Sequence, residues 1–171
     1  EEVFRAENIS RTGYFKDVSF HVNKGEILGL TGLVGAGRTQ VCETIFGIEQ
    51  KDEGKIFLNG IEVHIKDPLE AMTLGIGYLP EDRQKQGLIL DWGIGRNITL
   101  PVIDKMVKGR WLDDKKERET AKRLAEKVDP KAVSIFDKAS SLSGGNQQKV
   151  VVAKLLASDL KLIILDEPTK G

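Results

Sequence analysis

The sequence contains very little cysteine: Cys42 is the single one among 171 residues. One cysteine excludes a disulfide framework within the chain and favours a protein of a reducing compartment. The sequence also lacks any apolar run of about 18 residues, which excludes a membrane-spanning helix. A signal-peptide pattern of a basic start, an apolar stretch and small residues is missing as well. We therefore expect a cytoplasmic globular domain.

Neither sign of charge prevails, because 26 basic residues balance 26 acidic ones and the isoelectric point is near 7.0. This balance gives no support to a general attraction for nucleic acid or for an anionic membrane. The charged run at residues 115–128 has mixed signs, and its apolar residues fall on one helical face. It therefore predicts a solvated surface helix rather than a basic patch. The apolar positions are Ala121, Leu124, Ala125 and Val128.

The apolar pattern predicts both strands and helices in the first part of the chain. Strands are expected at residues 3–9, 18–22 and 26–30; the second alternates its apolar side chains inward and the third is buried. A helix is expected at 39–46, with the glycine that follows it as a C-cap. Residues 55–63 predict a β-hairpin that turns on Asn-Gly.

The later part of the chain predicts a return to α/β order. A short helix at 67–73 and a strand at 75–79 are expected first, and the character of the sequence then changes from about residue 84. Residues 143–157 predict a helix with a serine at its N-cap. The fully apolar run at 162–165 predicts a strand suited to the middle of a parallel sheet.

Between the third strand and the first helix the sequence reads GLVGAGRT, at residues 32–39. This is the spacing of a phosphate-binding loop, G-x-x-x-x-G-K-[ST], in the strand–loop–helix context that such a loop requires. Its glycines let backbone N–H groups converge on one anion, and the following helix adds the positive end of its dipole. The hydroxyl of Thr39 can bind Mg²⁺. A glycine-rich turn without a ligand is the alternative interpretation.

Arginine stands at position 38, where the phosphate-loop pattern has lysine. Arg38 keeps the positive charge, but its planar guanidinium needs room on both sides and need not reach the same phosphate oxygens. We therefore expect nucleotide binding to survive better than turnover.

The apolar strand at 162–165 ends in two carboxylates, Asp166 and Glu167. A strand of this form delivers an aspartate to the Mg²⁺ shell of phosphate-loop enzymes. Asp166 would hold the metal or its water, and Glu167 can polarise the attacking water as a general base. Asp-Glu-Pro-Thr is also good turn chemistry, so a surface turn is the alternative.

A second candidate anion site reads LSGGNQQK, at residues 142–149. A serine and two glycines that open a helix offer a hydroxyl and backbone amides to an anion. A capping turn without a ligand is the alternative for this segment taken alone.

In this order, the phosphate loop, LSGGNQQ and the apolar strand with Asp-Glu-Pro-Thr resemble the ATP-binding cassette (ABC) family. The signature loop separates that family from other phosphate-loop proteins. Three segments narrow the resemblance to the second ATP-binding module of bacterial monosaccharide importers of the ribose, galactose, xylose and arabinose types. These segments are GAGRTQ at 35–40, LPEDRQKQGLIL at 79–90 and LSGGNQQK at 142–149. The resemblance covers essentially the whole chain.

The resemblance implies an α/β fold: a phosphate-loop NTPase core with an N-terminal antiparallel β region and an inserted helical subdomain. It divides the chain into a nucleotide-binding core at 1–83, a helical subdomain at 84–141, and a signature helix with the Asp-Glu strand at 142–171. Because the sequence begins with Glu1-Glu2 and ends directly after the apolar strand, we expect a fragment. Residues 1–171 would form a single incomplete cassette whose C-terminal part is missing.

In the ABC family two cassettes pair head to tail, and each ATP lies between the phosphate loop of one and the signature loop of the other. The resemblance implies ATP and Mg²⁺ as ligands, Glu167 as the catalytic residue, and Thr39 and Asp166 as metal ligands. The residues expected to contact ATP are Gly32, Leu33, Val34, Gly35, Ala36, Gly37, Arg38, Thr39 and Gln40 in the loop, and Ser143, Gly144 and Gly145 in the signature.

The two sites of such a pair need not be equal. In the importers that this chain resembles, the first module usually has the lysine form of the loop. The site completed by this chain's signature is therefore the stronger candidate for turnover, and the site at its own loop the weaker one.

The region of the family's glutamine loop has no clear glutamine here, since residues 79–83 read LPEDR. Glu81 or Asp82 would take over a water or metal contact there, or the segment is a simple exposed turn. An aromatic residue that stacks on adenine is expected before the second strand. Tyr14 and Phe15 are the candidates, either for stacking or for packing.

The family's switch histidine would lie beyond the end of this chain. His21 and His64 come too early to serve, and we expect them to be ordinary surface or strand residues.

Three functions compete. The first, which Glu167 favours, is an ATP-hydrolysing subunit of a sugar importer. It would act at the cytoplasmic face of the membrane with a second cassette fused upstream, permease subunits and, indirectly, a periplasmic sugar-binding protein. The second, which Arg38 favours, is a regulatory module that binds ATP and turns over little itself. The third is a cassette acting on DNA or the ribosome; the balanced charge and the short separation between loop and signature speak against it.

Overall fold

The computed structural model describes residues 1–168, apart from the side chain of Arg83. The chain forms two compact units. The first comprises Glu1–Tyr78 and Lys161–Ile164, and the second comprises Leu79–Leu160 and the described residues 165–168.

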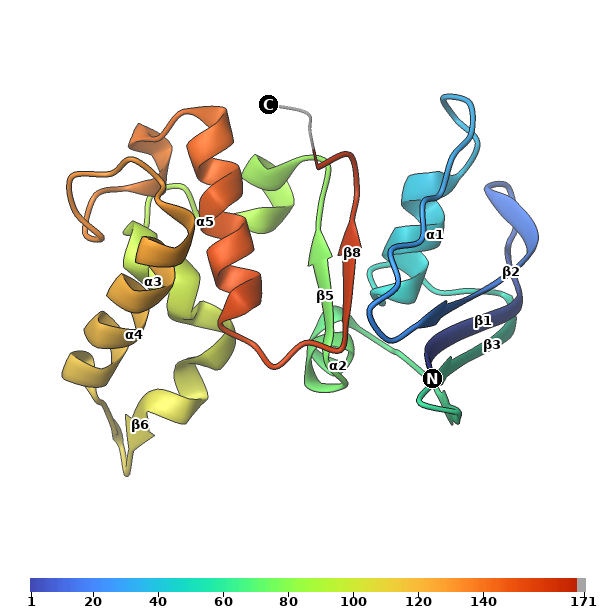
Figure 1. Ribbon diagram of the computed structural model, residues 1–171, viewed down its shortest axis with the longest axis horizontal. Coiled ribbons are helices and arrows are strands. Elements are labelled where there is room, and N and C mark those ends of the chain that lie inside the picture. The colour runs from blue at the N-terminus through green and yellow to red at the C-terminus, as the bar shows by residue number, and fades with distance from the viewer. Residues whose placement is uncertain (169–171) are drawn as a thin grey trace. The chain divides into compact units, whose positions relative to one another are not determined.

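The first unit contains a four-stranded antiparallel sheet with the order β2-β1-β3-β4 (Figure 1). Helix α1 packs on this sheet, because the buried apolar side chains of the helix and of β1 and β3 form one cluster. The predicted strands at 3–9 and 18–22 are confirmed, and the apolar side chains of the second are half-buried against that cluster. The bounds are β1 (Glu2–Arg11), β2 (Phe15–Asn23), β3 (Glu53–Leu58), β4 (Ile61–Val63) and α1 (Arg38–Ile45).

Local signals account for the turns of this unit. Asn59 and Gly60 join β3 to β4 with φ angles of 50° and 77°, the left-handed conformation that a two-residue hairpin turn requires. Gly47 follows α1 with φ of 80°, as its predicted C-cap role demands. Helix α2 (Pro68–Thr73) begins after Asp67, whose carboxylate accepts the Glu70 N–H at 2.8 Å.

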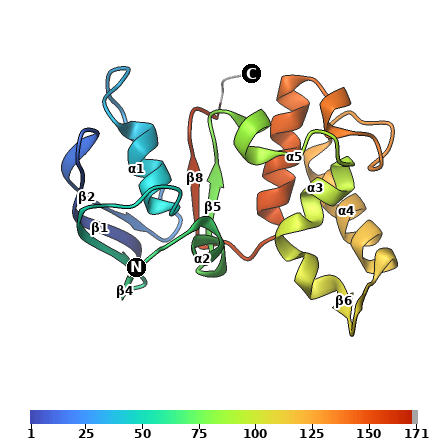
Figure 2. The same cartoon turned by 180° about the vertical axis from the view of Figure 1, so that it is seen from behind.

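Two further strands, β5 (Ile76–Leu79) and β8 (Leu162–Leu165), form a separate two-stranded sheet. Their arrows point the same way in Figure 1 and Figure 2, so the pair is parallel. The Lys161 N–H donates to the Gly75 carbonyl at one end of the pair, and the Asp166 N–H donates to the Leu79 carbonyl at the other. Strand β8 thereby brings Asp166 to the end of β5.

Two strand predictions need correction. Residues 26–30 do not form a buried strand: they have no strand conformation, and Ile27 is 97% exposed. A strand requires backbone partners, and no described strand pairs with this segment, so its apolar pattern alone does not produce one. Strand β8 is not central either, because β5 is its sole partner among the described strands and Ile163 and Leu165 are about half exposed.

The second unit is mainly helical. Its α-helices share one apolar cluster, to which α3 contributes Ile94 and Ile98, α4 contributes Leu124, and α5 contributes Val150 and Val151. The helix bounds are α3 (Ile94–Thr99), α4 (Asp114–Val128) and α5 (Gly144–Leu156). The remaining short elements are η1 (Arg83–Gly87), η2 (Leu100–Met106), η3 (Ala139–Ser141), β6 (Val107–Lys108) and β7 (Trp111–Leu112).

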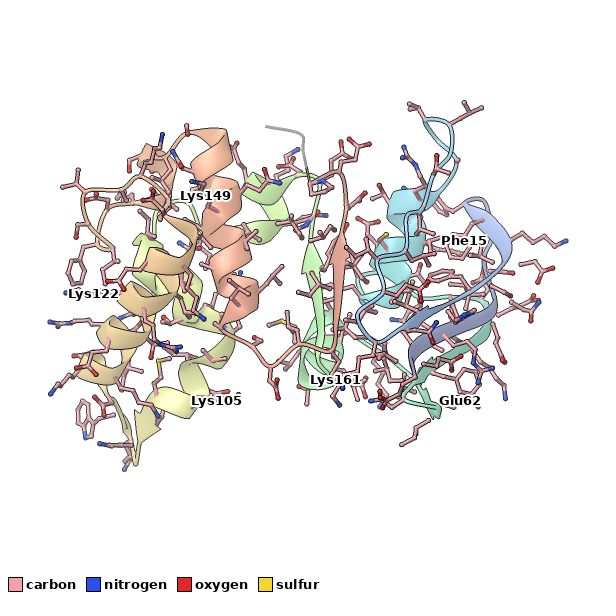
Figure 3. The ribbon with its side chains drawn as sticks, in the orientation of Figure 1. Phe15, Glu62, Lys105, Lys122, Lys149 and Lys161 are labelled. Atoms are coloured by element: carbon pink, nitrogen blue, oxygen red, sulfur yellow. The ribbon has the colours of Figure 1, made fainter. Side chains whose placement is uncertain are left out.

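Helix α4 is the surface helix that the sequence predicts. Ala121, Leu124 and Ala125 are buried against α3 and α5, whereas Lys122 is exposed (Figure 3). Asp113 caps its first turn by accepting the Lys116 N–H at 3.1 Å. None of the described helices is long and apolar enough to cross a membrane.

Candidate functional site

The glycine loop at residues 32–37 leads directly into helix α1. Gly35 and Gly37 take φ angles of 81° and 84°, and Gly37 occupies the N-cap position of α1. No described side chain caps this helix, and its first turn carries no acidic residue. Backbone N–H groups at the start of a helix can bind an anion, and the helix dipole favours negative charge there. A phosphate group fits this arrangement.

The loop side chains that precede Gly37 are exposed, and Val34 is 99% exposed. A tight turn within the loop is closed by the Ala36 N–H, which donates to the Leu33 carbonyl at 3.1 Å. Arg38, Thr39 and Gln40 are half-buried in the first turn of α1. Thr39 is the second residue of α1, so its hydroxyl lies at the N-terminal end of the helix, the end that attracts anions.

The end of the loop lies against the segment that carries the aromatic candidates. A methyl group added to Gly37 would lie 2.7 Å from the Tyr14 carbonyl oxygen and 3.5 Å from Cβ of Phe15. Phe15, labelled in Figure 3, is half-buried against the apolar cluster of the sheet, so packing accounts for it. Tyr14 is 53% exposed, which leaves it as the aromatic ring accessible to a ligand beside the loop.

The signature segment opens helix α5 in the second unit. Ser143 occupies the N-cap position as predicted, but its side chain does not cap the helix; its Oγ instead accepts from Asn146 Nδ2 at 2.9 Å. A methyl group on Gly145 would meet no described atom within 4 Å. The helix start is therefore open on the side of Gly145, and its first N–H groups can meet an anion from outside.

The carboxylate pair lies at the end of β8. Asp166 is 7% exposed, whereas Glu167 is exposed and takes a positive φ of 46°. Gln148 of the signature helix donates from Nε2 to the Pro168 carbonyl, which ties this helix to the segment directly after the two acids.

The residues described contain no group of three or more His, Cys, Asp or Glu able to hold a metal ion. In phosphate sites Mg²⁺ uses one or two protein ligands together with substrate phosphates and water. Thr39 belongs to the first unit and Asp166 to the second.

Asp82 is engaged within its own turn. Its carboxylate accepts the Lys85 N–H at 3.2 Å and pairs with Lys85 Nζ at 3.1 Å. The side-chain hydrogen bond from Lys85 lowers the pKa of Asp82. Asp82 is exposed, and these contacts favour the exposed turn over a metal contact as the interpretation of this residue.

Two groups of residues near the site have no signal in the sequence pattern. Gln84, directly after residues 79–83, donates from Nε2 to Gln147 Oε1 at 3.0 Å. Arg11 lies over the ring of Tyr14, with 4.2 Å from its guanidinium carbon to the ring centroid. Gln84 and Gln147 are 63 positions apart in the sequence, whereas the Tyr14 N–H donates to the Arg11 carbonyl within one turn. His21 and His64 are exposed, and His21 lies in β2, as expected of ordinary surface or strand residues.

A cavity of about 390 Å³ opens in the second unit beside α3 and α4. One wall contains Glu117, which is 6% exposed and pairs with Arg96 at 2.9 Å. Thr99 Oγ1 donates to the same carboxylate at 3.0 Å. The aromatic rings of Trp92 and Phe136 also line the cavity and remain partly exposed.

Comparison with known proteins agrees with these features. A sequence profile of the family described as "ABC transporter" matches residues 15–170. The chain is 48% identical to the ribose import ATP-binding protein RbsA of Lactococcus lactis subsp. cremoris over 171 residues, covering 100% of the chain and 35% of that protein. It is also 48% identical to a putative ribose/galactose/methyl galactoside import ATP-binding protein of Rhizobium meliloti, covering 34% of it. The chain thus spans about a third of the length of these relatives.

The fold has solved counterparts. The structure of MJ1267, an ATP-binding cassette of an ABC transporter, superposes with a TM-score of 0.79 at 25% identity, over 100% of this chain and 71% of that one. The chain therefore belongs to the ABC transporter family and has the α/β phosphate-loop fold of its ATP-binding cassettes.

Proposed function

We propose that the chain is an ATP-binding and ATP-hydrolysing module that energises import of a monosaccharide across the cytoplasmic membrane. The observation that carries the proposal is the uncapped start of α1 behind two left-handed glycines, in a chain of the ABC transporter family. Backbone N–H groups of residues 32–39 would bind the phosphates of ATP.

Each side chain of the loop has a distinct task in this proposal. Arg38 would supply positive charge to the outer phosphates, and Thr39 and Asp166 are each proposed as a ligand of Mg²⁺. When bound, the metal neutralises charge that develops on the phosphates. Glu167 would accept a proton from the attacking water. Burial of Asp166 and exposure of Glu167 agree with these separate tasks, because the second carboxylate must reach water.

The signature segment would serve a different ATP. Ser143, Gly144 and Gly145 would close over the γ-phosphate held by the loop of a second cassette, using the open start of α5. The curated relatives are about three times as long as this chain. This length supports our proposal that another cassette precedes this chain in the same native protein. This chain would be the second module of that protein.

We propose that the two sites are unequal. Arg38 replaces the compact charge of lysine by a planar group that reaches phosphate oxygens in a different way. The site at residues 32–39 would bind ATP and turn it over slowly, and most turnover would take place at the site that Ser143 completes. A purely regulatory module is the alternative, and it differs in predicting no turnover at all at the loop of this chain.

Permease subunits are the proposed membrane partners, with a periplasmic sugar-binding protein acting through them. The names of the relatives favour ribose as the sugar. We propose that the permease contacts the second unit at the cavity, because Trp92 and Phe136 are aromatic side chains on its wall and such side chains anchor interfaces. The module would then lie at the cytoplasmic face of the membrane.

The experiment measures ribose-stimulated ATP hydrolysis of the full-length protein with its permease in proteoliposomes. Ser143→Arg should lower the rate at least about a hundredfold, because the arginine side chain would fill the space at the N-terminus of α5. Lys149→Ala is the matched control on the same helix: Lys149, labelled in Figure 3, donates to the Asp129 carbonyl at 2.8 Å. An unchanged rate with Ser143→Arg would contradict the proposal.

The docking surface has its own test. Trp92→Ala should weaken copurification with the permease, whereas Trp111→Ala should not, because Trp111 is 82% exposed in the β6–β7 hairpin and does not line the cavity. Equal copurification of both variants would contradict docking at the cavity.

A further inference from the structure

Tyr14 is held by a side chain that no motif predicts. The guanidinium carbon of Arg11 lies 4.2 Å from the Tyr14 ring centroid, and the Tyr14 N–H donates to the Arg11 carbonyl at 3.0 Å. Arg11 Nη2 in turn pairs with Glu49 Oε2 at 2.8 Å. The Arg11 side chain is 17% exposed, so it is packed in place rather than mobile in solvent.

Tyr14 adjoins the phosphate loop. Its carbonyl lies against Gly37, because a methyl group added to Gly37 would approach the carbonyl oxygen to 2.7 Å and force the backbone to shift. One face of the ring is covered by Arg11, and 53% of the residue surface remains exposed. An aromatic ring in such a position can stack on a nucleotide base.

We propose that Arg11, held by Glu49, is a positioning residue that fixes the ring of Tyr14 for stacking on the base of the nucleotide. This inference rests on the proposed function, because the phosphates of that nucleotide are those bound at residues 32–39. Arg11 fixes the ring through cation–π attraction and its planar shape. A ring that is ordered before binding loses less freedom when the base arrives, which raises affinity.

The ion pair alone does not explain this arrangement. Glu49 is 43% exposed, and ion pairs between partly exposed side chains contribute little to stability. What the pair does is direct the guanidinium onto the ring. Lysine in place of Arg11 would keep the charge and lose the flat surface that lies on Tyr14.

The same strand offers a matched control. Arg5 of β1 lies over the ring of Phe57 at the same 4.2 Å and pairs with Glu2 at 3.0 Å and with Glu7. Phe57 is the register partner of Arg5 on β3, within the sheet. Arg5→Ala therefore removes an equivalent cation–π contact without touching Tyr14.

The test compares two ligands in the full-length protein: ATP-Mg²⁺ and inorganic tripolyphosphate-Mg²⁺, which has no base. Hydrogen–deuterium exchange of the peptide covering residues 32–45 reports binding at this loop alone as each ligand is titrated. Arg11→Ala and Arg11→Lys should raise the apparent Kd for ATP about threefold to tenfold. Both should leave the Kd for tripolyphosphate unchanged, and Arg5→Ala should change neither Kd.

The outcomes distinguish a failure of the inference about Arg11 from a failure of the proposed function. Equal weakening of both ligands by Arg11→Lys, or ATP binding that is insensitive to Arg11, overturns the inference and leaves the proposed function intact. Glu49→Gln provides a second variant, which should weaken ATP selectively if Glu49 directs Arg11. Absence of protection by either ligand in the unmodified protein overturns the proposed function, and the inference with it.

Discussion

Gln84 donates from Nε2 to Oε1 of Gln147 at 3.0 Å, and this contact joins the turn after β5 to the signature helix α5. Gln147 is buried, and its own Nε2 donates to the Ala139 carbonyl at 3.3 Å. A second link lies further along the same helix, where Lys154 Nζ donates to the Gly87 carbonyl at 3.0 Å. The segment from 84 to 87 is thus fastened to the helix that carries the signature.

We expect substitution of Gln147 to cost more stability than substitution of Gln84. Gln147→Leu should lower the free energy of unfolding by about 1–3 kcal/mol, because it leaves a buried carbonyl without its donor. Gln84→Ala should cost less than about 1 kcal/mol, since Gln84 is exposed and water replaces its partner. Urea unfolding of both variants and of the double variant measures the coupling, and additive costs would show that the contact contributes nothing.

Gly37→Ala should be strongly destabilising and should disrupt the loop. The substitution combines a left-handed φ of 84° with a methyl group 2.7 Å from the Tyr14 carbonyl. Gly25→Ala is the matched control, because Gly25 has φ of 77° but no described atom within 4 Å of the added methyl.

The control should cost about 1 kcal/mol, the strain of the backbone conformation alone. Gly37→Ala should exceed it by at least about 1 kcal/mol in thermal or urea unfolding. Equal costs for the two variants would mean that the Tyr14 carbonyl makes no steric contact with a side chain at position 37.

Asn97→Ala should destabilise the second unit by about 2–4 kcal/mol. Asn97 is fully buried; its Oδ1 accepts the Ile89 N–H at 2.8 Å and its Nδ2 donates to the Ile89 carbonyl at 3.0 Å. Both backbone groups lose their partner in the variant. Asn23→Ala, which removes an exposed bond to Glu26, should cost less than about 1 kcal/mol by the same measurement. A similar cost for both would contradict this role of Asn97.

Local signals were sufficient to predict much of the fold. The Asn59-Gly60 turn, the glycine that follows α1 and the mixed charges of α4 each depend on residues close together in the sequence, so their patterns predict structure directly. Residues 26–30 were predicted wrongly, because an apolar run becomes a strand only where another strand supplies hydrogen bonds.

The candidate site was predictable to a smaller extent. Glycine spacing marked residues 32–39 as the candidate loop, because backbone conformation at a phosphate loop depends on glycine itself. The contacts of Arg11 with Tyr14 and of Gln84 with Gln147 were not predictable. The second of these joins residues 63 positions apart, and no spacing rule connects them.

Arg38→Lys should raise ATP turnover at the loop of this chain by roughly threefold to tenfold, which corresponds to about 0.7–1.4 kcal/mol of transition-state stabilisation. The apparent Kd for ATP should change by less than about threefold, because both side chains keep the charge that holds phosphate. Single-turnover hydrolysis and binding titrations of the full-length protein separate the two quantities. A large change in Kd with unchanged turnover would contradict this role of Arg38.

The proposal that the two ATP sites turn over at unequal rates is tested most directly by the steady-state ATPase rate of the full-length protein. The rate after Glu167→Gln is compared with the rate after the equivalent glutamate-to-glutamine change in the partner cassette. The account predicts that Glu167→Gln lowers the rate by less than about twofold, whereas the change in the partner lowers it at least about a hundredfold, the loss expected for a general base. Equal and complete loss of turnover in the two variants would contradict it.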